Sequence, residues 1–346
     1  MDRVTSFRHV GMVALVAMLP AGKGAVASEP QPPPAFRPGA EWPDDRGVHI
    51  NAHGGGVLFH EGIYYWFGEH KVAGRRGNRA WEGIRCYSST NLYAWANEGL
   101  ALEVSNDPES PITRGCVMER PKVIHHRGTG QFVMWFHLEL KDRGYVAALT
   151  GVALSENPTG PYRFVKAFRP HAGVWAEGFD ASSPRAEIHE RDHAGGQMSR
   201  DMTLFVDDDG TAYHIHASEE NATLHIAQLT PDYLDFSGRY VRVLPGQFNE
   251  APAICKRDGV YYLLSSGCTG WAPNAARMAT APHPFGPWTE QENPCTGVNP
   301  VTGLGPEKTF GGQSTFILPV QGRHDAWIAM FDEWRPEDAI DGRYYW

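Results

Sequence analysis

Six acidic residues stand in short polar motifs that end, or directly precede, runs of aromatic and β-branched residues. They occur in YYWFGEHK, VMERPKV, SRDMTLF, ASEEN and NEAPAICK, and are Glu69, Glu119, Asp201, Glu219, Glu220 and Glu250. Gln313 in GGQSTF and Asp332 in MFDEW occupy the same kind of position. Convergent carboxyl groups suit hydrolysis of a glycosidic bond, because one protonates the leaving oxygen while another group activates water or attacks the sugar.

Crowding would give these carboxyl groups the protonation states that such a reaction needs. Like charges in a desolvated pocket raise one another's pKa, so one carboxyl group can stay protonated near neutral pH and serve as the acid. A single acidic residue before a strand is far more often a turn former or a solvated charge. The recurrence of acidic residues at the same place in successive repeats is what favours a shared site.

A module made of a turn and an aromatic strand recurs five times along the chain. It reads HEGIYYWFGE from His60, RGTGQFVMWFHLE from Arg127, DDDGTAYHIHASEE from Asp207, KRDGVYYLLSSG from Lys256 and GRHDAWIAMFDEW from Gly322. Each module predicts one arm of a β-hairpin. Five of them predict an all-β, five-bladed β-propeller, whose innermost strands all begin at one end of a common axis. A two-sheet sandwich is the alternative, but would show shorter and more regular strand spacing.

The N-terminal region has the organisation of a secretory signal peptide, which we assign to residues 1–27. Basic residues precede the apolar stretch Val10–Leu19, and Ala25-Val26-Ala27 offers small residues for cleavage. Residues 28–45 form a Pro-rich leader, and residues 46–346 the propeller domain, whose last blade we expect to be truncated. The protein is therefore expected to be secreted or periplasmic.

Charge and composition point to a neutral, sugar-like partner. A net charge of −9 argues against nucleic acid and anionic membranes, and no segment after the signal peptide could span a bilayer. Flat aromatic faces for sugar rings are offered by Trp81, Trp95, Trp175, Trp271 and Trp334, although packing between blades explains most tryptophans. We expect a polysaccharide or oligosaccharide as partner, no cofactor, no metal and no membrane insertion, and leave the oligomeric state open.

Three weaker patterns have simple explanations. Five cysteines permit at most two bridges, and Cys268 with Cys295 is the one pair we suggest. His214 and His216 share one strand face, where packed or hydrogen-bonded imidazoles are more common than a metal site. The segment 207–210, DDDG, resembles a calcium loop but serves well as a tight turn.

The long motifs resemble glycoside hydrolase family 43, and most closely its exo-β-1,3-galactanase branch. The resemblance runs from about Ile50 over nearly all of the mature chain. It rests on INAHGGGVLFHEGIYYWFGE, MERPKVI, SRDMTLFVDDDGTAYHIHASEENATL, NEAPAICKRDGVYYLLSSGCTGWAPN and GGQSTFILP. It implies a five-bladed propeller and a secreted, inverting glycoside hydrolase that acts on β-1,3-galactan or related galactose-containing side chains.

The resemblance also implies roles for individual residues. Glu250 matches the general acid, Asp201 the carboxylate that orients it and tunes its pKa, and Glu119 a carboxylate that contacts the terminal sugar. The expected catalytic residues are Glu250, Asp201, Glu119 and Gln313. The expected substrate-binding residues are Glu69, His53, Asn221, Thr269 and Trp271.

The catalytic base departs from the wider family's pattern. Most members carry an Asp at the start of the first innermost strand, where this chain reads NAHGGG from Asn51. The galactanase-like branch shares that absence and uses a Gln on the last blade to hold the attacking water, a position that Gln313 matches. A neutral amide is a poor proton acceptor, so Glu119 and Glu69 remain alternative bases.

Two other functions remain open at this point. The same scaffold could release α-L-arabinofuranose or β-xylose, because pocket shape rather than the acid selects the sugar. A propeller without its usual base could also be a non-catalytic carbohydrate-binding protein, although the complete NEAP motif around Glu250 argues for catalysis.

Overall fold

The computed structural model describes residues 35–346, except 73, 75, 271, 336–343 and 346. The expected signal peptide and residues 28–34 of the leader lie outside these residues, so both assignments stay predictions. The described chain belongs to one compact unit, Phe36–Trp346. None of its described helices has the length and apolar character needed to cross a bilayer.

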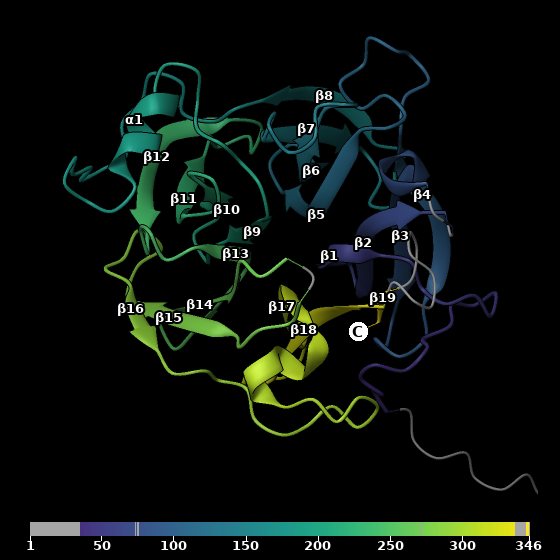
Figure 1. Cartoon of the computed structure of the whole chain (residues 1–346). Helices are drawn as coiled ribbons and strands as arrows, with labels where there is room; N and C mark the ends of the chain where they lie inside the picture. The colour runs from purple at the N-terminus through teal and green to yellow at the C-terminus, as the bar shows by residue number, and fades with distance from the viewer. Residues whose placement is uncertain (1–34, 73, 75, 271, 336–343, 346) are drawn as a thin grey trace, which may run out of the picture. The chain divides into compact units, whose positions relative to one another are not determined.

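Within the described residues, the strands form five antiparallel sheets arranged as blades around a common axis (Figure 1). The sheets contain β1–β4, β5–β8, β9–β12, β13–β16 and β17–β19, and are called blades one to five here. Each blade is one continuous piece of chain, and its first strand is the innermost. The predicted all-β, five-bladed β-propeller is therefore confirmed.

The strands and helices have the following bounds. Blade one holds β1 (His53–His60), β2 (Ile63–Lys71), β3 (Trp81–Ser89) and β4 (Ala96–Glu103). Blade two holds β5 (Val117–His126), β6 (Gln131–Glu139), β7 (Leu149–Ser155) and β8 (Arg163–Phe168). Blade three holds β9 (Met202–Val206), β10 (Ala212–Ser218), β11 (Thr223–Leu229) and β12 (Phe236–Val243). Blade four holds β13 (Asn249–Arg257), β14 (Val260–Gly267), β15 (Arg277–Ala281) and β16 (Thr289–Gln291). Blade five holds β17 (Gln313–Pro319), β18 (Trp327–Trp334) and β19 (Tyr344–Tyr345), and the helices are η1 (Gly77–Ala80), α1 (Ala186–Asp192) and η2 (Pro306–Gly311).

The five repeated modules are the inner hairpins of the five blades. Each supplies the turn after an innermost strand and then the second strand, which is β2, β6, β10, β14 or β18. The middle of β2, nearly all of β6 and all of β10 are buried on both faces, because neighbouring blades cover them. This explains why these strands consist of continuous aromatic and β-branched runs.

The innermost strands make a closed circuit of contacts around the axis. β1, β5, β9, β13 and β17 contact one another in that order, and β17 also contacts β1. The backbone N–H of Gln321 in blade five donates a hydrogen bond to the hydroxyl of Tyr64 in blade one, at 3.2 Å. The polar residues at the starts of these strands are therefore held at one end of the axis.

Two of the five tryptophans suggested as sugar platforms belong to the core instead, and Trp334 is half-buried at the end of β18. Trp81 and Trp95 are buried, and Trp95 packs against Trp66 with ring centroids 5.3 Å apart. Trp175 is exposed, but its ring stacks on that of His193 at 3.9 Å. Trp271 lies outside the described residues. Packing thus explains Trp81 and Trp95, as the more common role of tryptophan predicts.

The suggested disulfide between Cys268 and Cys295 is not formed, because all five cysteines are free. The two thiols belong to different surroundings at blade four. Cys268 Sγ lies 3.9 Å from the carbonyl oxygen of Asn221, at the axial end of the blade. Cys295 follows the outermost strand and packs against an apolar cluster that includes Ala253 and Leu264.

Five histidines are buried in and beside blade three. They are His171, His189, His214, His216 and His225. His214 and His216 approach each other at 3.0 Å between their Nδ1 atoms, so the packed and hydrogen-bonded arrangement expected for this pair is confirmed. Burial lowers the pKa of His214 to about 3, and burial with neighbouring histidines holds the pKa of His216 well below 6.5.

These shifts predict that the fold loses stability as the pH falls below 6.5. The unfolded chain binds protons near pH 6.5 that buried His214 accepts only near pH 3. Each such histidine therefore costs about 1.4 kcal/mol of unfolding free energy per pH unit across that window. Replacing His214 by Phe should flatten the dependence of unfolding free energy on pH between 6.5 and 5 by that amount, measured by urea denaturation.

A matched control is His283→Gln, which alters an exposed imidazole and should leave the pH dependence unchanged. Identical pH dependence in the His214→Phe variant and the unaltered protein would contradict the prediction, whatever the stability of the variant at pH 8.

Candidate active site

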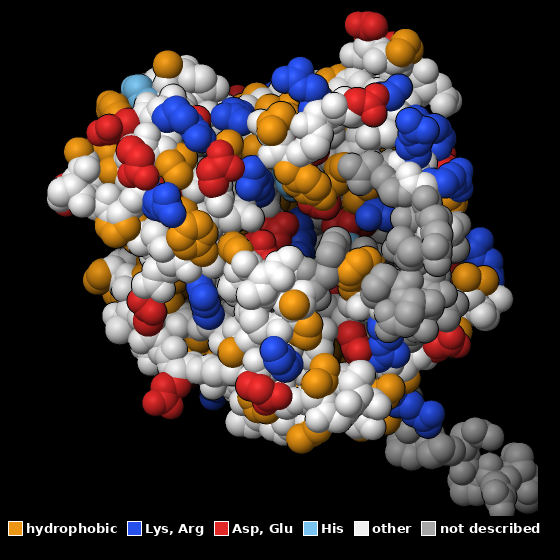
Figure 2. Space-filling view, viewed as in Figure 1, with side chains coloured by type: hydrophobic (Ala, Val, Ile, Leu, Met, Phe, Trp, Pro, Cys, Tyr) orange, Lys and Arg blue, Asp and Glu red, His pale blue; other side chains and the backbone are white. Residues whose placement is uncertain are grey.

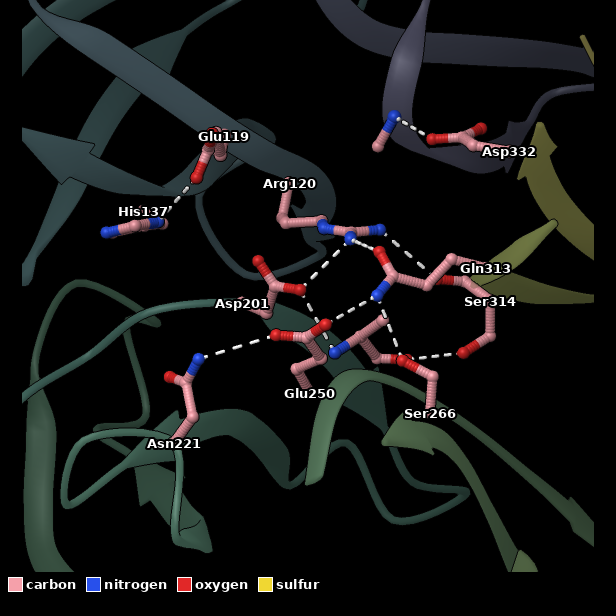
Figure 3. Close-up of polar contacts among 12 residues, drawn as sticks. Glu119, Arg120, His137, Asp201, Asn221, Glu250, Ser266, Gln313, Ser314 and Asp332 are labelled. Carbon is pink, nitrogen blue, oxygen red and sulfur yellow. Dashed lines mark hydrogen bonds and ion pairs between the residues drawn. The ribbon is translucent and has the colours of Figure 1, made fainter. Parts of the chain in front are cut away.

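The axial ends of four innermost strands carry β-bulges. The register shifts between His53 and Gly56 in β1, Glu119 and Lys122 in β5, Glu250 and Ala253 in β13, and Ser314 and Phe316 in β17. Arg120 and Ala251, within two of these bulges, have left-handed backbone with φ of 56° and 54°. A bulge bends its strand and redirects side chains. The polar side chains beside the bulges accordingly converge at the axis (Figure 3).

Glu250 lies among polar residues of several blades (Figure 3), and the face seen in Figure 2 has a central hollow with acidic side chains. Gln313 Nε2 donates a hydrogen bond to Glu250 Oε1 at 2.9 Å, and Asn221 Nδ2 donates to Oε2 at 3.4 Å. Asp201 Oδ2 accepts the backbone N–H of Ala251 at 3.1 Å (Figure 3). The structure thus brings together Glu250, Asp201, Gln313 and Asn221, which sequence analysis had placed in one site.

Glu250 has the protonation behaviour of a general acid. Burial, followed by the nearby charge of Asp201, raises its pKa to about 7, although Arg120 and the hydrogen bond from Gln313 oppose the rise. At pH 6 most molecules therefore hold a proton on Glu250. This is the shift expected for a carboxyl group that donates a proton near neutral pH.

Arg120 ties the site together, and sequence analysis did not single it out. Its guanidinium pairs with Asp201 at 3.0 Å, donates to the carbonyl oxygen of Ser314 at 3.1 Å and to Gln313 Oε1, and its backbone N–H donates to Glu69 at 3.0 Å. The side chain is buried. One residue of blade two thereby contacts blades one, three and five. The only sequence feature that could have identified Arg120 as a site residue is its position directly after Glu119 in MERPKV.

Glu119 is held ionised by a second chain of polar contacts. Burial alone would raise its pKa, but hydrogen bonds with His137 at 3.0 Å and Tyr145 at 2.6 Å lower it to about 2. His137 also contacts Glu139 at 3.0 Å, and despite burial these two carboxylates raise the pKa of His137 to about 9. Glu119 therefore stays a carboxylate over the working pH range, suited to accepting hydrogen bonds from sugar hydroxyl groups.

His53 and Glu69 were expected to bind substrate, and the structure buries both beneath the site. His53 Nδ1 pairs with Asp332 at 2.5 Å, and its Nε2 lies 3.9 Å from Glu69. Burial raises the pKa of Glu69 to about 7. Glu69 has 2% of its surface exposed and bonds the backbone N–H of Arg120. Contacts with substrate thus stay predictions for these two residues, whereas support of Arg120 by Glu69 is directly visible.

Gln313 contacts the acid itself in this structure. Its Nε2 also donates to Ser266 Oγ at 2.9 Å, while its Oε1 accepts from Arg120. Both ends of the amide are therefore engaged, which fixes its orientation toward Glu250. The Oε1 atom of Gln313 has a second lone pair, so it can also accept a hydrogen bond from a water molecule.

Two acidic residues of the expected ring, Glu219 and Glu220, have cationic or histidine partners of their own and make no hydrogen bond or ion pair with Glu250 or Asp201 among the described residues. Their place in the ring stays a prediction. Glu219 is buried and accepts hydrogen bonds from Arg242 at 2.6 Å and from His225 at 2.9 Å. Glu220 is partly exposed and pairs with Arg200 at 3.0 Å and Arg191 at 3.2 Å. A left-handed turn explains these different partners, because residues 219–221 have φ of 53°, 56° and 65° and point their side chains in different directions.

Among the remaining expected sugar contacts, Thr269 is exposed at the axial end of blade four. Its Oγ1 donates to the carbonyl oxygen of Ala272, and Asn274 donates to it at 2.7 Å. Trp271 lies outside the described residues. Binding of sugar by Thr269 and Trp271 stays a prediction.

Two clusters bring potential metal-ligand atoms within 4.8 Å of one another, but the carboxylates in them already form ion pairs with protein side chains. The clusters are His189, Glu219 and His225, and Glu119, His137 and Asp201. Arg242 contacts both oxygens of Glu219, at 2.6 and 2.7 Å, and Arg120 pairs with Asp201. A cation would have to displace these guanidinium groups, so charge pairing favours neither cluster as a metal centre.

A propeller with convergent carboxyl groups at one end of its axis, one of them protonated near neutral pH, is the architecture of a carbohydrate-active enzyme. The sequence profile of glycosyl hydrolases family 43 matches residues 57–314. The chain therefore belongs to glycosyl hydrolase family 43.

Solved structures show the same relationship, and a curated protein is more distantly similar. The chain is 48% identical to BT3683, a GH43 β-1,3-galactosidase solved with galactodeoxynojirimycin, with a TM-score of 0.82 over 89% of this chain and 93% of that one. It is 35% identical to an exo-β-1,3-galactanase from Clostridium thermocellum, with a TM-score of 0.74 over 90% and 61% of the two chains. It is 29% identical over 59% of its length to a β-D-galactofuranosidase of Aspergillus niger, and the match spans about half (54%) of that curated relative.

The left-handed turn at 219–221 predicts that Glu219 supports the site through Asn221. Replacing Glu219 by Gln removes the charge that Arg242 and His225 hold, which should let the strained turn relax and move Asn221 away from Glu250. We expect kcat/KM for glycoside hydrolysis to fall about tenfold. The neighbouring variant Glu220→Gln, which changes a partly exposed carboxylate, should lose less than about twofold. Equal kinetics for the two variants would contradict this role for Glu219.

Proposed function

We propose that this chain is an exported, inverting glycoside hydrolase that releases galactose from β-1,3-linked galactan or related side chains by exo action. The observation that carries the proposal is Glu250, a carboxyl group with a pKa of about 7, bonded to Gln313 and Asn221 in the axial hollow. Similarity to a β-1,3-galactosidase and to an exo-β-1,3-galactanase supports galactose as the sugar.

In the proposed reaction the proton of Glu250 moves to the bridging oxygen while the bond between that oxygen and the anomeric carbon breaks. Water forms the new bond to the anomeric carbon from the opposite face of the sugar and loses a proton. Asp201 holds the backbone beside Glu250 and raises its pKa, so the acid regains its proton for the next cycle. Hydroxyl groups of the terminal sugar would bind the Glu119 carboxylate, which is ionised.

The proton of water has two candidate acceptors, Gln313 and Glu119. Gln313 is already bonded to Glu250 and Arg120, so it is oriented but weakly basic. Glu119 is a carboxylate, but its pKa of about 2 makes it a poor base. If Gln313 holds the water, Gln313→Ala should lower kcat with little change in KM, whereas Glu119→Gln should mainly raise KM. The reverse pattern would assign the base to Glu119.

Product analysis tests the proposed reaction directly. Incubation with β-1,3-galactan, followed by proton NMR, should show galactose as the sole early product, first as the α-anomer, because inversion converts a β-linkage to an α-product. Longer oligosaccharides would exclude exo action, and early β-galactose would exclude single displacement. Release of arabinose or xylose from aryl glycosides, without release of galactose from galactan, would instead support the alternative specificity for arabinofuranosides or xylosides.

Replacing Glu250 by Gln should lower kcat by about 100-fold or more, the usual contribution of general acid catalysis. The side chain keeps its size and can still accept hydrogen bonds, so sugar binding measured by calorimetry should persist. Unchanged turnover would remove Glu250 from the mechanism. Sugar binding without product release in the unaltered protein would instead identify a carbohydrate-binding propeller.

The pKa of Glu250 also predicts the pH dependence of the reaction. An acid must be protonated, so kcat/KM should fall about tenfold per pH unit once the pH exceeds about 7. Between pH 4 and 6, Glu250 is protonated and Glu119 ionised, so the rate should be nearly level wherever the fold remains intact. A profile that rises above pH 7 would contradict the assignment.

A further inference from the structure

A cavity of about 480 Å³ opens at the axial end of blade four. It lies where β13 begins, β14 ends and β15 begins, and is lined by residues 247–248, 267–269 and 274–277. Its volume falls within the range of about 300–1,000 Å³ that is typical of small-molecule sites. None of the roles assigned above uses this cavity as a whole.

The cavity lies next to Glu250 along both β13, which carries the acid, and its partner strand β14. Glu250 pairs with Ser266, and the cavity residues Phe248 and Cys268 each stand two positions from that pair. Burial, followed by the nearby charge of Glu250, raises the pKa of the Cys268 thiol to about 12, so this cavity residue lies close to the acid. A general acid must contact the oxygen that joins the terminal sugar to the rest of the substrate. The sugar that follows this oxygen must therefore lie next to Glu250, and the cavity is beside it.

Phe248 gives the cavity an aromatic wall. The Arg185 guanidinium lies over its ring, 5.1 Å from the centroid, so a sugar would pack on the part of the ring that Arg185 does not cover. The Phe248 side chain is 37% exposed and its backbone is left-handed, with φ of 57°. The N–H of Phe248 donates to the carbonyl oxygen of Ala222 at 3.2 Å, and its carbonyl oxygen accepts from Arg277 at 3.1 Å. The backbone is thus clamped in a strained conformation that keeps a phenyl ring at the surface beside the acid. Strained backbone of this kind concentrates at ligand-binding positions.

The other cavity residues indicate a neutral ligand rich in hydroxyl groups. No acidic side chain lines the cavity among the described residues. Arg277 Nη1 is occupied by the carbonyl oxygens of Gln247 and Phe248, whereas its Nη2 makes no hydrogen bond within the described part of the chain. An exposed phenyl ring beside one such donor suits a pyranose, whose C–H face packs on the ring while a hydroxyl group meets the guanidinium.

We propose that this cavity binds the galactosyl unit on the leaving side of the scissile bond, and that the ring of Phe248 is its packing face. The inference rests on the proposed function and deepens it. Phe248 then determines how well the enzyme uses oligosaccharides relative to substrates with a small leaving group. It belongs to substrate recognition and does not touch the reacting atoms.

The test compares two substrates that share a terminal galactose but differ on the leaving side. β-1,3-Galactobiose places a sugar in the cavity, whereas β-galactosyl fluoride places only a fluoride ion beside Glu250. Replacing Phe248 by Ala should lower kcat/KM for galactobiose about tenfold, mainly through KM, and should leave kcat/KM for the fluoride within about twofold. Phe248→Tyr should retain activity on both, because it keeps a flat ring.

A matched control is Tyr93→Ala, which removes an equally exposed aromatic ring from the loop between β3 and β4, at the other end of the blades. This variant should leave kcat/KM unchanged for both substrates. Equal losses on galactobiose and fluoride in Phe248→Ala, or no loss on either, would overturn the inference while leaving the proposed function intact. An unaltered protein that is inactive on galactobiose and galactan would overturn the proposed function itself, and the inference with it.

Discussion

The site depends on one buried cation that holds several buried carboxylates together. Arg120 pairs with Asp201 at 3.0 Å and bonds Gln313 and Ser314, while its backbone bonds Glu69. Burial opposes its charge, but Asp201, Asp332 and Glu69 raise its pKa, so the guanidinium stays charged. Breaking such a buried pair leaves an uncompensated charge, which costs about 3–5 kcal/mol. The blades are therefore held in register at the point where the chemistry is proposed.

This arrangement also separates the protonation states of the carboxyl groups. Glu119 has its own partners in His137 and Tyr145, which keep it ionised. Asp201 pairs with Arg120, whereas the hydrogen bonds to Glu250 come from the neutral amides of Gln313 and Asn221. Carboxyl groups crowded at one axis thus have unequal partners. Glu250, which has neutral hydrogen-bond partners, retains its proton near neutral pH, as a general acid must.

Much of the fold could be predicted from the sequence, because its signal is local. Each inner hairpin has a turn, and the second strands β2, β6 and β10 are largely buried on both faces. Turn and strand both show in consecutive residues, such as Gly62 and the run from Tyr64. Glu250, Asp201 and Gln313 could be placed in one site because they occupy equivalent places in successive blades. The structure confirms that they meet there.

What could not be predicted depends on backbone direction and on long-range pairing. The left-handed turn at 219–221 sends Glu219 toward Arg242 and Asn221 toward Glu250. The bulge at Arg120 likewise has no glycine to reveal it, and its partners come from blades distant in sequence. Buried Trp81 and Trp95 could not be separated from surface residues because strand and loop tryptophans look alike in sequence.

The central claim is that the axial environment keeps Glu250 protonated near neutral pH. Carbon-13 NMR of glutamate-labelled protein, titrated from pH 4 to 9 and assigned by comparison with Glu250→Gln, measures this property without any substrate. The account predicts a carboxyl resonance that titrates near pH 7 and is missing from the variant. A Glu250 resonance that titrates near the ordinary value of 4.5 would contradict it.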